Sequence, residues 1–485
     1  GGFHAQAEVD QFNQTRLVIG IDDYDFSWKL KKGESFSTPE VCLTYSADGF
    51  SKLSQTLHQA IVSNLIRSCW KDRVRPILVN NWEATYFDFN KDNLIAIAKE
   101  AAELNLDMLV LDDGWFGKRD DDFSGLGDWF VNEKKLCGTL SELVKEVHDM
   151  GLSFGLWFEP EMISEDSDLY RAHPDWALVI PGRQPIRSRS QLVLDMSRED
   201  VTDYLTERIC DIVEKADIQY IKWDMNRTFS EVFSNGNDRE YQGKVCHKYI
   251  LGVYELYERL TSRFPHVLFE SCASGGARFD PGMLYYAPQG WTSDDTDAIE
   301  RLKIQYGTSM VYPVSCMGSH VSASPNHQTN RVTPIETRAD VAYFGTFGYE
   351  LDLLKLGEED KAEIRRQIAF MKEKRDLIQK GTFYRLKSPF EGNETAWMIV
   401  SEDQKKALVG YYRVMQPVNV GFKRLKLKGL KEDICYKVSG YDYDCYGDEL
   451  MQVGMILSDS ASGVWKKGVN DKGDFQAKVF EIVAG

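Results

Sequence analysis

The sequence lacks the long apolar segments and the excess positive charge that a membrane or nucleic-acid partner requires. No apolar run approaches the roughly twenty residues of a bilayer-spanning helix. Lys and Arg number 58 against 75 Asp and Glu, so the net charge is −17 at pH 7. Such a surface repels anionic partners, and we expect neither nucleic acid nor a membrane as a partner. A small uncharged ligand meets no such repulsion.

Several catalytic signatures are also missing. The chain has no HExxH or CxxC motif and no close-set histidines, so a zinc site is poorly supported. It has no GxSxG elbow for a nucleophilic serine, and no glycine-rich phosphate loop follows the first predicted barrel strand. We predict no metal and no organic cofactor. A magnesium-dependent barrel of the enolase type needs only strand-end carboxylates and a lysine, so it stays open as an alternative.

Cysteine is odd in number and scattered along the chain. Several of the nine cysteines sit in apolar segments typical of strands or helices, which favours free buried thiols over a disulfide framework. Free thiols are typical of a reducing compartment, so we predict a cytoplasmic location. The nine positions are Cys42, Cys69, Cys137, Cys210, Cys246, Cys272, Cys316, Cys435 and Cys445.

The periodicity of the apolar residues divides the chain into three parts. Residues 1–75 hold short β-like runs (TRLVIGI, PEVCLTY) and a helical segment. Residues 76–380 alternate strand and amphipathic helix eight times, which predicts a (β/α)8 barrel; a doubly wound open sheet is the alternative. Residues 381–485 return to short β-like runs and predict a C-terminal antiparallel β-sandwich. The eight barrel strands are expected in PILVNNWEA, DMLVLDDGWF, LSFGLWFEPEM, QLVLDM, IQYIKWDM, HVLFESCASGG, GWTSDDT and PVSCMGSH.

The stretch IQYIKWDMNR places charged side chains on one face of a strand. Side chains alternate along a strand, so Lys222, Asp224 and Asn226 point one way while Ile221 and Trp223 point to the core. A charge in a closed core is costly unless it is paired. The polar face therefore indicates either a strand-end cap, with the lysine neutralising the aspartate, or a functional site.

Carboxylates recur at the ends of the other predicted strands. Asp112 and Asp113, Glu159, Glu270 and Asp294 all lie there, and tryptophans accompany several of them. Because the carboxyl ends of barrel strands meet at one rim, a shared site is favoured over separate caps. Two carboxylates with different roles are the machinery of glycoside hydrolysis, and flat aromatic faces suit a neutral sugar.

Seven longer motifs follow one another along the chain: LDDGWFG, GLWFEPEM, QLVLD, KWDMNR, ESCASGGARFDPGMLYY, WTSDDTDAIERL and PNHQTNR. Together they closely resemble the α-galactosidases of glycoside hydrolase family 36. The resemblance implies a large N-terminal β-sandwich domain, of which the first 75 residues are expected to be a remnant, followed by the barrel and a C-terminal β-sandwich. It also implies a homo-oligomer, since relatives are often tetramers.

Carried over position by position, the resemblance makes Asp224 the nucleophile and Asp294 the general acid/base of a retaining mechanism. Their carboxyl groups are then expected about 5–5.5 Å apart. Asp112 and Asp113 are expected to hold the galactose 4- and 6-hydroxyls. The run SDDTD departs from the common SDNTD at Asp295, and a carboxylate there would raise the pKa of the acid if it lies close.

The same carry-over assigns sugar contacts around the reacting carbon. Lys222 and Asn226 are expected to bind neighbouring hydroxyls, with Lys222 partly offsetting the charge of Asp224. Arg189 and Trp157 are expected to wall the sugar.

The remaining contacts concern the 2-position and the outer edge of the site. Cys272 and Gly275 are expected at the 2-hydroxyl, and Trp82 at the subsite edge. We predict hydrolysis of terminal, mainly α-1,6-linked galactose from small neutral substrates such as melibiose and raffinose, with galactose preferred over N-acetylgalactosamine. The alternatives are an α-N-acetylgalactosaminidase and a sugar-binding module without catalysis.

Overall fold

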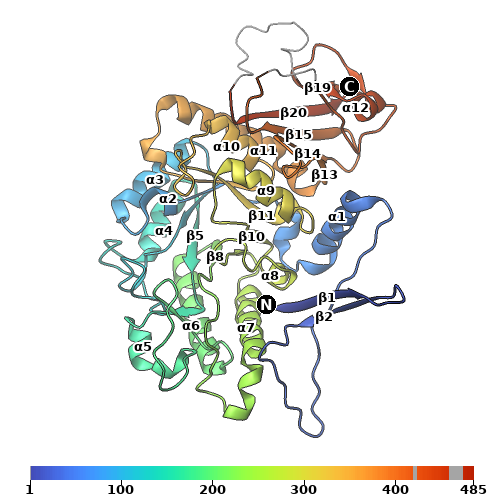
Figure 1. The fold of residues 1–485 in the computed structure, drawn as a ribbon. Coiled ribbons are helices and arrows are strands. Elements are labelled where there is room, and N and C mark those ends of the chain that lie inside the picture. The colour runs from blue at the N-terminus through green and yellow to red at the C-terminus, as the bar shows by residue number, and fades with distance from the viewer. Residues whose placement is uncertain (1, 419–422, 458–472) are drawn as a thin grey trace.

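The computed structural model describes residues 2–418, 423–457 and 473–485, and its centre is a closed barrel of eight parallel strands (Figure 1). The predicted (β/α)8 architecture is confirmed. Each strand is short and buried, and their carboxyl ends meet at one rim. In barrel order the strands are β3 (Leu78–Asn80), β4 (Met108–Leu111), β5 (Ser153–Phe158), β8 (Tyr220–Trp223), β9 (Leu268–Ser271), β10 (Gln289–Trp291), β11 (Met317–Ser322) and β12 (Thr346–Glu350).

Helices surround the barrel, and the sequence explains where they begin. Asn90 and Thr139 each cap a helix through a reciprocal capping box, which satisfies backbone N–H groups of the first turn. In the helix after Thr139, Leu140, Leu143, Val144 and Val147 form one buried stripe at helical spacing. The main helices are α3 (Lys91–Glu103), α4 (Leu140–Asp149), α6 (Glu199–Ala216), α7 (Val245–Arg263), α9 (Ala298–Thr308), α10 (Ile335–Ala342) and α11 (Glu358–Lys380); shorter ones are α2 (Trp82–Thr85), α5 (Asp168–Ala172) and α8 (Pro281–Tyr286).

One of the eight expected barrel strands is wrong, and one barrel strand was not predicted. QLVLDM does not join the barrel, because its residues Leu192–Val193 (β7) pair antiparallel with Met162–Ile163 (β6) in a local ladder. The eighth strand is instead β12, in the segment TFGYE, which lies after the last predicted strand, PVSCMGSH, and pairs with β11 and β3. A short apolar run does not reveal its pairing partner, and two glycines near β12 weaken its strand pattern. As a result, the strand that leads to Asp224 is the fourth of the barrel rather than the fifth.

The C-terminal part is an antiparallel sheet, as predicted, with its own apolar core. It packs on the barrel through α10 and the ring of Trp397, which lies 5.7 Å from the ring of Phe344. Helix α11 ends at Lys380 and the sheet begins at Thr382; the division at 381, like that at 76, stays a prediction. The sheet order is β13 (Thr382–Lys387), β14 (Glu394–Val400), β15 (Lys406–Arg413), β20 (Gln476–Ala484), β17 (Cys435–Val438) and β18 (Cys445–Tyr446), beside a ladder of β16 (Arg424–Leu425) and β19 (Met455–Ile456) and the helix α12 (Gly447–Gln452).

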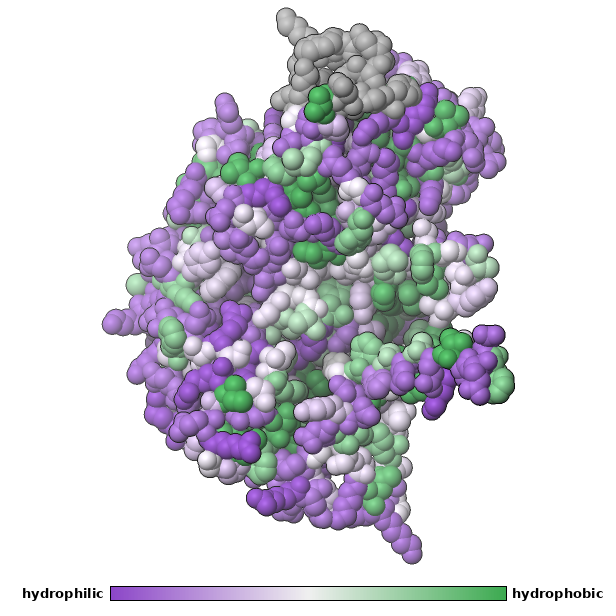
Figure 2. Space-filling model, viewed as in Figure 1, coloured by the Kyte–Doolittle hydropathy of each residue, from purple (hydrophilic) through white to green (hydrophobic). Residues whose placement is uncertain are grey.

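The amino-terminal part is far more exposed than the barrel. The strands β1 (Phe3–Val9) and β2 (Thr15–Ile21) form a projecting hairpin on which hydrophobic side chains lie among polar ones (Figures 1 and 2). The β-like run PEVCLTY forms no strand, because no other described strand pairs with it. Trp28 and Phe36 pack against His247 of α7 and anchor the segment before α1 (Gly49–Ala60). Among the described residues, no helix has the length and apolar character needed to cross a bilayer.

Candidate active site at the carboxyl end of the barrel

Asp224, just after β8, lies buried among hydrogen-bond donors. The Asn226 amide donates to its Oδ2 at 2.8 Å, the Trp157 indole donates to the same oxygen at 3.3 Å, and the Met225 backbone N–H donates to Oδ1 at 2.8 Å. The Asp224 backbone N–H is itself bonded to the Phe158 carbonyl of the neighbouring strand. Donors on both oxygens fix the position and orientation of the Asp224 carboxyl group.

Asp294, three residues after β10, lies at the exposed rim of the same site. Its pKa is raised to about 6, first because the surrounding protein removes part of its hydration and then because Asp224 carries a like charge nearby. Lys222 and Arg189 act in the opposite direction. The carboxyl group of Asp294 is therefore partly protonated near neutral pH.

The predicted pair just after β4, Asp112 and Asp113, is bound by two different cations. Lys222 donates to Asp112 Oδ2 at 2.9 Å, and Asn80 donates to the same oxygen at 2.6 Å. Arg119 forms a forked pair with Asp113, in which its Nη2 lies 2.8 Å from Oδ2. Burial nevertheless raises the pKa of Asp113 to about 6. The ion-pair partner of Lys222 is thus Asp112, and not Asp224 as its position in the strand had suggested.

A polar chain leads from the surface to Asp224. The guanidinium of Arg189 donates to Asn226 Oδ1 at 2.8 Å, and Ser274 Oγ donates to the same oxygen at 3.1 Å. With its oxygen occupied in this way, Asn226 turns its NH2 group toward Asp224. Arg189 and Ser274 both adopt a left-handed backbone conformation, with φ of 49° and 44°, and such conformations often mark functional loops.

The run CASGG forms the floor between the two aspartates. Cys272 is 2% exposed, and its thiol pKa is raised well above the usual range by burial and by the nearby charge of Asp224. Gly275 has a φ of 81°, and a Cβ there would lie 2.6 Å from the Asp294 nitrogen and from Ser293 Cα. A glycine is therefore required for the close approach of this loop to the Asp294 backbone.

Aromatic rings wall the site. Trp157 is buried, and Trp115 donates from its indole nitrogen to the Trp157 carbonyl at 2.9 Å, which fixes that wall. Trp291 lies beneath Lys222, with the ammonium 6.0 Å from the ring centre. Trp82, just after β3, is half-buried and packs edge-on against Tyr86; its place at the subsite edge stays a prediction.

The sequence did not indicate Glu350 or Arg119, and it gave Glu159 no role of its own. Glu350 ends β12 and accepts a hydrogen bond from His320 at 3.3 Å. Had β12 been recognised as a barrel strand, Glu350 would have been found as a further carboxylate at a strand end. Glu159 is fully buried, with a pKa raised to about 8 by burial and by Asp224. Arg119 lies in an irregular loop and carries no pattern that could have been recognised. Glu161, by contrast, is a structural group, since Arg278 pairs with both of its oxygens.

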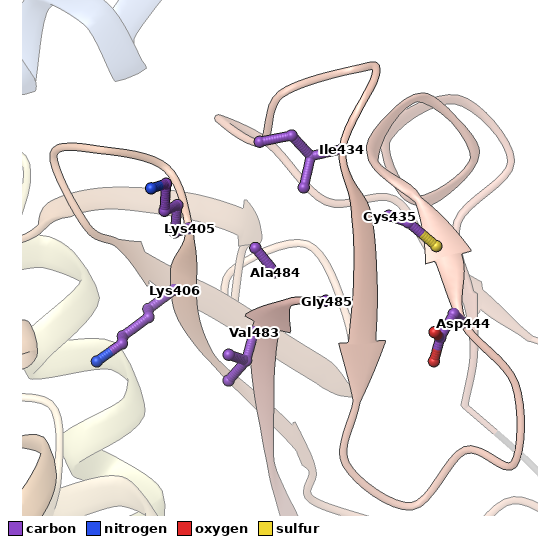
Figure 3. Close-up of a pocket in the computed structure, with 8 residues that line it drawn as sticks. All are labelled: Lys405, Lys406, Ile434, Cys435, Asp444, Val483, Ala484 and Gly485. Atoms are coloured by element: carbon purple, nitrogen blue, oxygen red, sulfur yellow. The ribbon is translucent and has the colours of Figure 1, made fainter.

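A separate open hollow lies on the C-terminal sheet (Figure 3). The figure shows Lys405 and Lys406 along one side and Asp444 on the other, with the last residues of the chain between them. Its lining holds one carboxylate and no aromatic ring. The chemistry of paired carboxylates and aromatic walls is found at the barrel rim, and we assign the site there.

The described residues 2–418, 423–457 and 473–485 contain no group of three or more His, Cys, Asp or Glu side chains that could hold a metal ion. Asp112 and Asp113 are the adjacent carboxylates at the rim that would suit a metal ion best, but they form ion pairs with Lys222 and Arg119. The donor set at the rim therefore consists of carboxylates compensated by side-chain cations.

The chain matches known proteins along most of its length. A family model described as Melibiase matches residues 35–381, and one described as Glycosyl hydrolase family 36 C-terminal domain matches residues 394–482. Alpha-galactosidase AgaA of Geobacillus stearothermophilus is 55% identical over 470 residues, which are 96% of this chain and 64% of AgaA. Alpha-galactosidase Mel36A of Lactobacillus acidophilus is 48% identical, over 100% of this chain and 64% of its own length.

The fold agrees with the same relatives. The crystal structure of a variant of AgaA in complex with raffinose superposes with a TM-score of 0.96 at 52% identity, and covers 100% of this chain and 66% of its own. This chain thus spans less than two thirds of the length of AgaA and Mel36A. Since the Melibiase model alone accounts for residues 35–381, the chain belongs to the melibiase family, within glycosyl hydrolase family 36.

Proposed function

We propose that this chain is the catalytic part of a retaining α-galactosidase. The observation that carries the proposal is the contrast between two carboxyl groups at one rim. Asp224 is buried and bonded by donors on both oxygens, whereas Asp294 is exposed and has a pKa raised to about 6. An ionised nucleophile and a protonated acid are what the first step of retaining glycoside hydrolysis needs.

In the proposed reaction, Asp224 attacks the anomeric carbon while Asp294 gives its proton to the leaving oxygen. The C–O bond breaks, and a glycosyl ester forms on Asp224. Asp294, now ionised, takes a proton from water, and the resulting hydroxide attacks the anomeric carbon and releases Asp224. The two displacements retain the α-configuration. We expect the two carboxyl groups to lie about 5–5.5 Å apart in the complex with substrate.

The proposed substrate is terminal, mainly α-1,6-linked galactose in melibiose- or raffinose-type sugars. The curated relatives are named alpha-galactosidases, and an AgaA variant has been solved with raffinose, which supports this assignment. Asp112 and Asp113 are held by Lys222 and Arg119, and we propose that their oxygens accept hydrogen bonds from the 4- and 6-hydroxyls. Trp157 and Trp82 supply the apolar walls.

Roles at carbons 1 to 3 are assigned to the polar chain and to the CASGG floor. We propose that Lys222, Asn226 and Arg189 donate to ring hydroxyls, and that Cys272 and Gly275 lie against the 2-hydroxyl. The buried thiol leaves little room for an acetamido group. Galactose is therefore preferred over N-acetylgalactosamine, whose hydrolase is the second candidate.

The test is hydrolysis of 4-nitrophenyl α-galactoside and melibiose with excess EDTA, followed by proton NMR of the first product anomer. The proposal requires unchanged activity with chelator and α-galactose as the first product. Loss of activity with EDTA would favour the magnesium-dependent barrel, and β-galactose would exclude the retaining route. Galactose binding without turnover would favour a sugar-binding module.

We also propose a cytoplasmic location and a homo-oligomer. All nine cysteines are free, which suits a reducing compartment. A light-scattering mass decides the oligomeric state, and a monomer at micromolar concentration would refute that part of the proposal.

A further inference from the structure

Arg301 is a buried cation on α9 that the proposed reaction does not use. It is 2% exposed, and its guanidinium lies 4.4 Å from the ring centre of Trp291. Among the described residues, no carboxylate forms an ion pair with it. Burial lowers its pKa to about 10, so it stays charged at neutral pH. A buried charge without a direct counter-ion is costly, which calls for a specific reason to keep it.

The hydrogen bonds of Arg301 converge on the loop that carries Asp294. Its Nη2 donates to the Ser293 carbonyl at 2.7 Å and its Nε to the Asp295 carbonyl at 2.8 Å. Its Nη1 donates to Thr292 Oγ1 and, at 3.1 Å, to the Gly318 carbonyl of β11. The rigid fork of a guanidinium thus bonds both residues that flank Asp294 in sequence.

The other sides of this loop are also fixed. The missing side chain of Gly275 lets the CASGG loop lie against the Asp294 nitrogen, where a Cβ would approach to 2.6 Å. On the exposed side, Gln328 donates to the Asp294 carbonyl at 2.9 Å. The backbone of Asp294 is therefore held from several directions, while no described group donates a hydrogen bond to its carboxyl oxygens.

We propose that Arg301 is the positioning residue of the acid/base loop, which sets where Asp294 delivers its proton. The inference rests on the proposed function and extends it. Arg301 is buried, and it acts through the carbonyls of Ser293 and Asp295. A proton donor must lie within hydrogen-bond reach of the leaving oxygen, and a displacement of about 1 Å costs on the order of 10²-fold in rate.

The experiment separates positioning from folding by the acidity of the leaving group. A sugar leaving group needs its proton as the C–O bond breaks, whereas 2,4-dinitrophenolate leaves without one. For Arg301→Gln we expect kcat/KM to fall about 100-fold on melibiose but less than about fivefold on 2,4-dinitrophenyl α-galactoside. Arg301→Lys keeps the charge but cannot bridge both carbonyls, and should give an intermediate ratio.

Arg75→Gln is the matched control. Arg75 is also buried, also has a pKa lowered to about 10, and also donates to backbone carbonyls, but it lies before β3 at the opposite end of the barrel. It should lower both rates by the same factor, if at all.

Each outcome decides the matter. Equal losses on both substrates for Arg301→Gln, or an equally skewed ratio for Arg75→Gln, would overturn the positioning role. If Arg301→Gln gives no folded protein by circular dichroism, an unchanged ratio for Arg301→Lys overturns it. A parent protein that hydrolyses neither substrate refutes the proposed function itself, and the role of Arg301 with it.

Discussion

The two sides of the barrel rim hold their carboxyl groups in opposite ways. On the β8 side, hydrogen bonds reach the Asp224 oxygens directly, from Trp157, Asn226 and Met225. On the β10 side, the hydrogen bonds reach the backbone around Asp294 and leave its side chain exposed. Direct donors fix the carboxyl group of Asp224 itself, whereas the bonds around Asp294 hold its backbone and leave its carboxyl group, with a pKa raised to about 6, free to exchange a proton. Two aspartates at the same rim are therefore suited to two different roles, Asp224 to that of a fixed nucleophile and Asp294 to that of a proton donor.

The largest expected effect comes from removing the bonded carboxylate. Asp224→Ala should lower kcat on 4-nitrophenyl α-galactoside by about 10⁴-fold or more, because no other group can form the glycosyl ester. Added azide should enter the emptied space and attack the anomeric carbon once, with inversion. Proton NMR should then detect β-galactosyl azide. An α-configured azide product would contradict the assignment of Asp224.

The exposed carboxyl group comes next, and its effect depends on pH. Since the pKa of Asp294 is raised to about 6, the proton donor is present below that value and is lost as pH rises through it. In the parent, kcat/KM on melibiose should fall above about pH 6. In Asp294→Asn, kcat/KM on melibiose should be about 10³-fold lower at pH 5, and it should no longer fall as the pH rises above about 6. A descending limb that survives in Asp294→Asn would assign it to another group.

The sequence sufficed for the fold class and for the residues that terminate recognisable strands. Alternating strand and helix segments predicted the barrel, and the strand-end rule led to Asp112, Asp224 and Asp294. Pairing between strands was harder, because a two-residue ladder such as β6 with β7 looks like a barrel strand when only its own residues are read.

Partners set by tertiary placement could not be predicted in the same way. Lys222 is two residues from Asp224 in sequence, yet its ammonium bonds Asp112, which lies 110 residues away. Arg119 and Arg301 fall in a loop and a helix whose patterns are ordinary, and only the fold brings them to Asp113 and to the Asp294 loop. The groups that pair with or position the carboxylates of a site are thus less visible in sequence than the carboxylates themselves.

The contact between the two sides can be tested at Gly275. A Cβ there would push on Ser293 and Asp294 and displace the acid, while Asp224 keeps its direct donors. Gly275→Ala should therefore cost about 10²-fold in kcat/KM on melibiose and much less on 2,4-dinitrophenyl α-galactoside. Gly151→Ala is the control, because its φ of 86° is similar but open space surrounds it. Gly151→Ala should lower the free energy of unfolding in urea by about 1 kcal/mol and should leave kcat/KM unchanged. Equal activity losses in both variants would point to backbone strain instead of displacement.

The smallest expected effect concerns the floor between the two aspartates. Cys272 is buried beside Asp224 and is proposed to leave little room at the 2-position of the sugar. Cys272→Ala removes one sulfur atom and neither carboxylate, so the rate on the galactoside should fall only a few-fold. The ratio of kcat/KM for the 4-nitrophenyl glycosides of galactose and N-acetylgalactosamine should narrow by about tenfold, the size expected for relief of one steric contact. Cys316 is also buried but lies just before β11, at the amino end of that strand and therefore away from the rim, so Cys316→Ala should leave the ratio of the two kcat/KM values unchanged. A parent that hydrolyses both glycosides with comparable kcat/KM would remove the basis for the galactose preference, and with it the role given to this thiol.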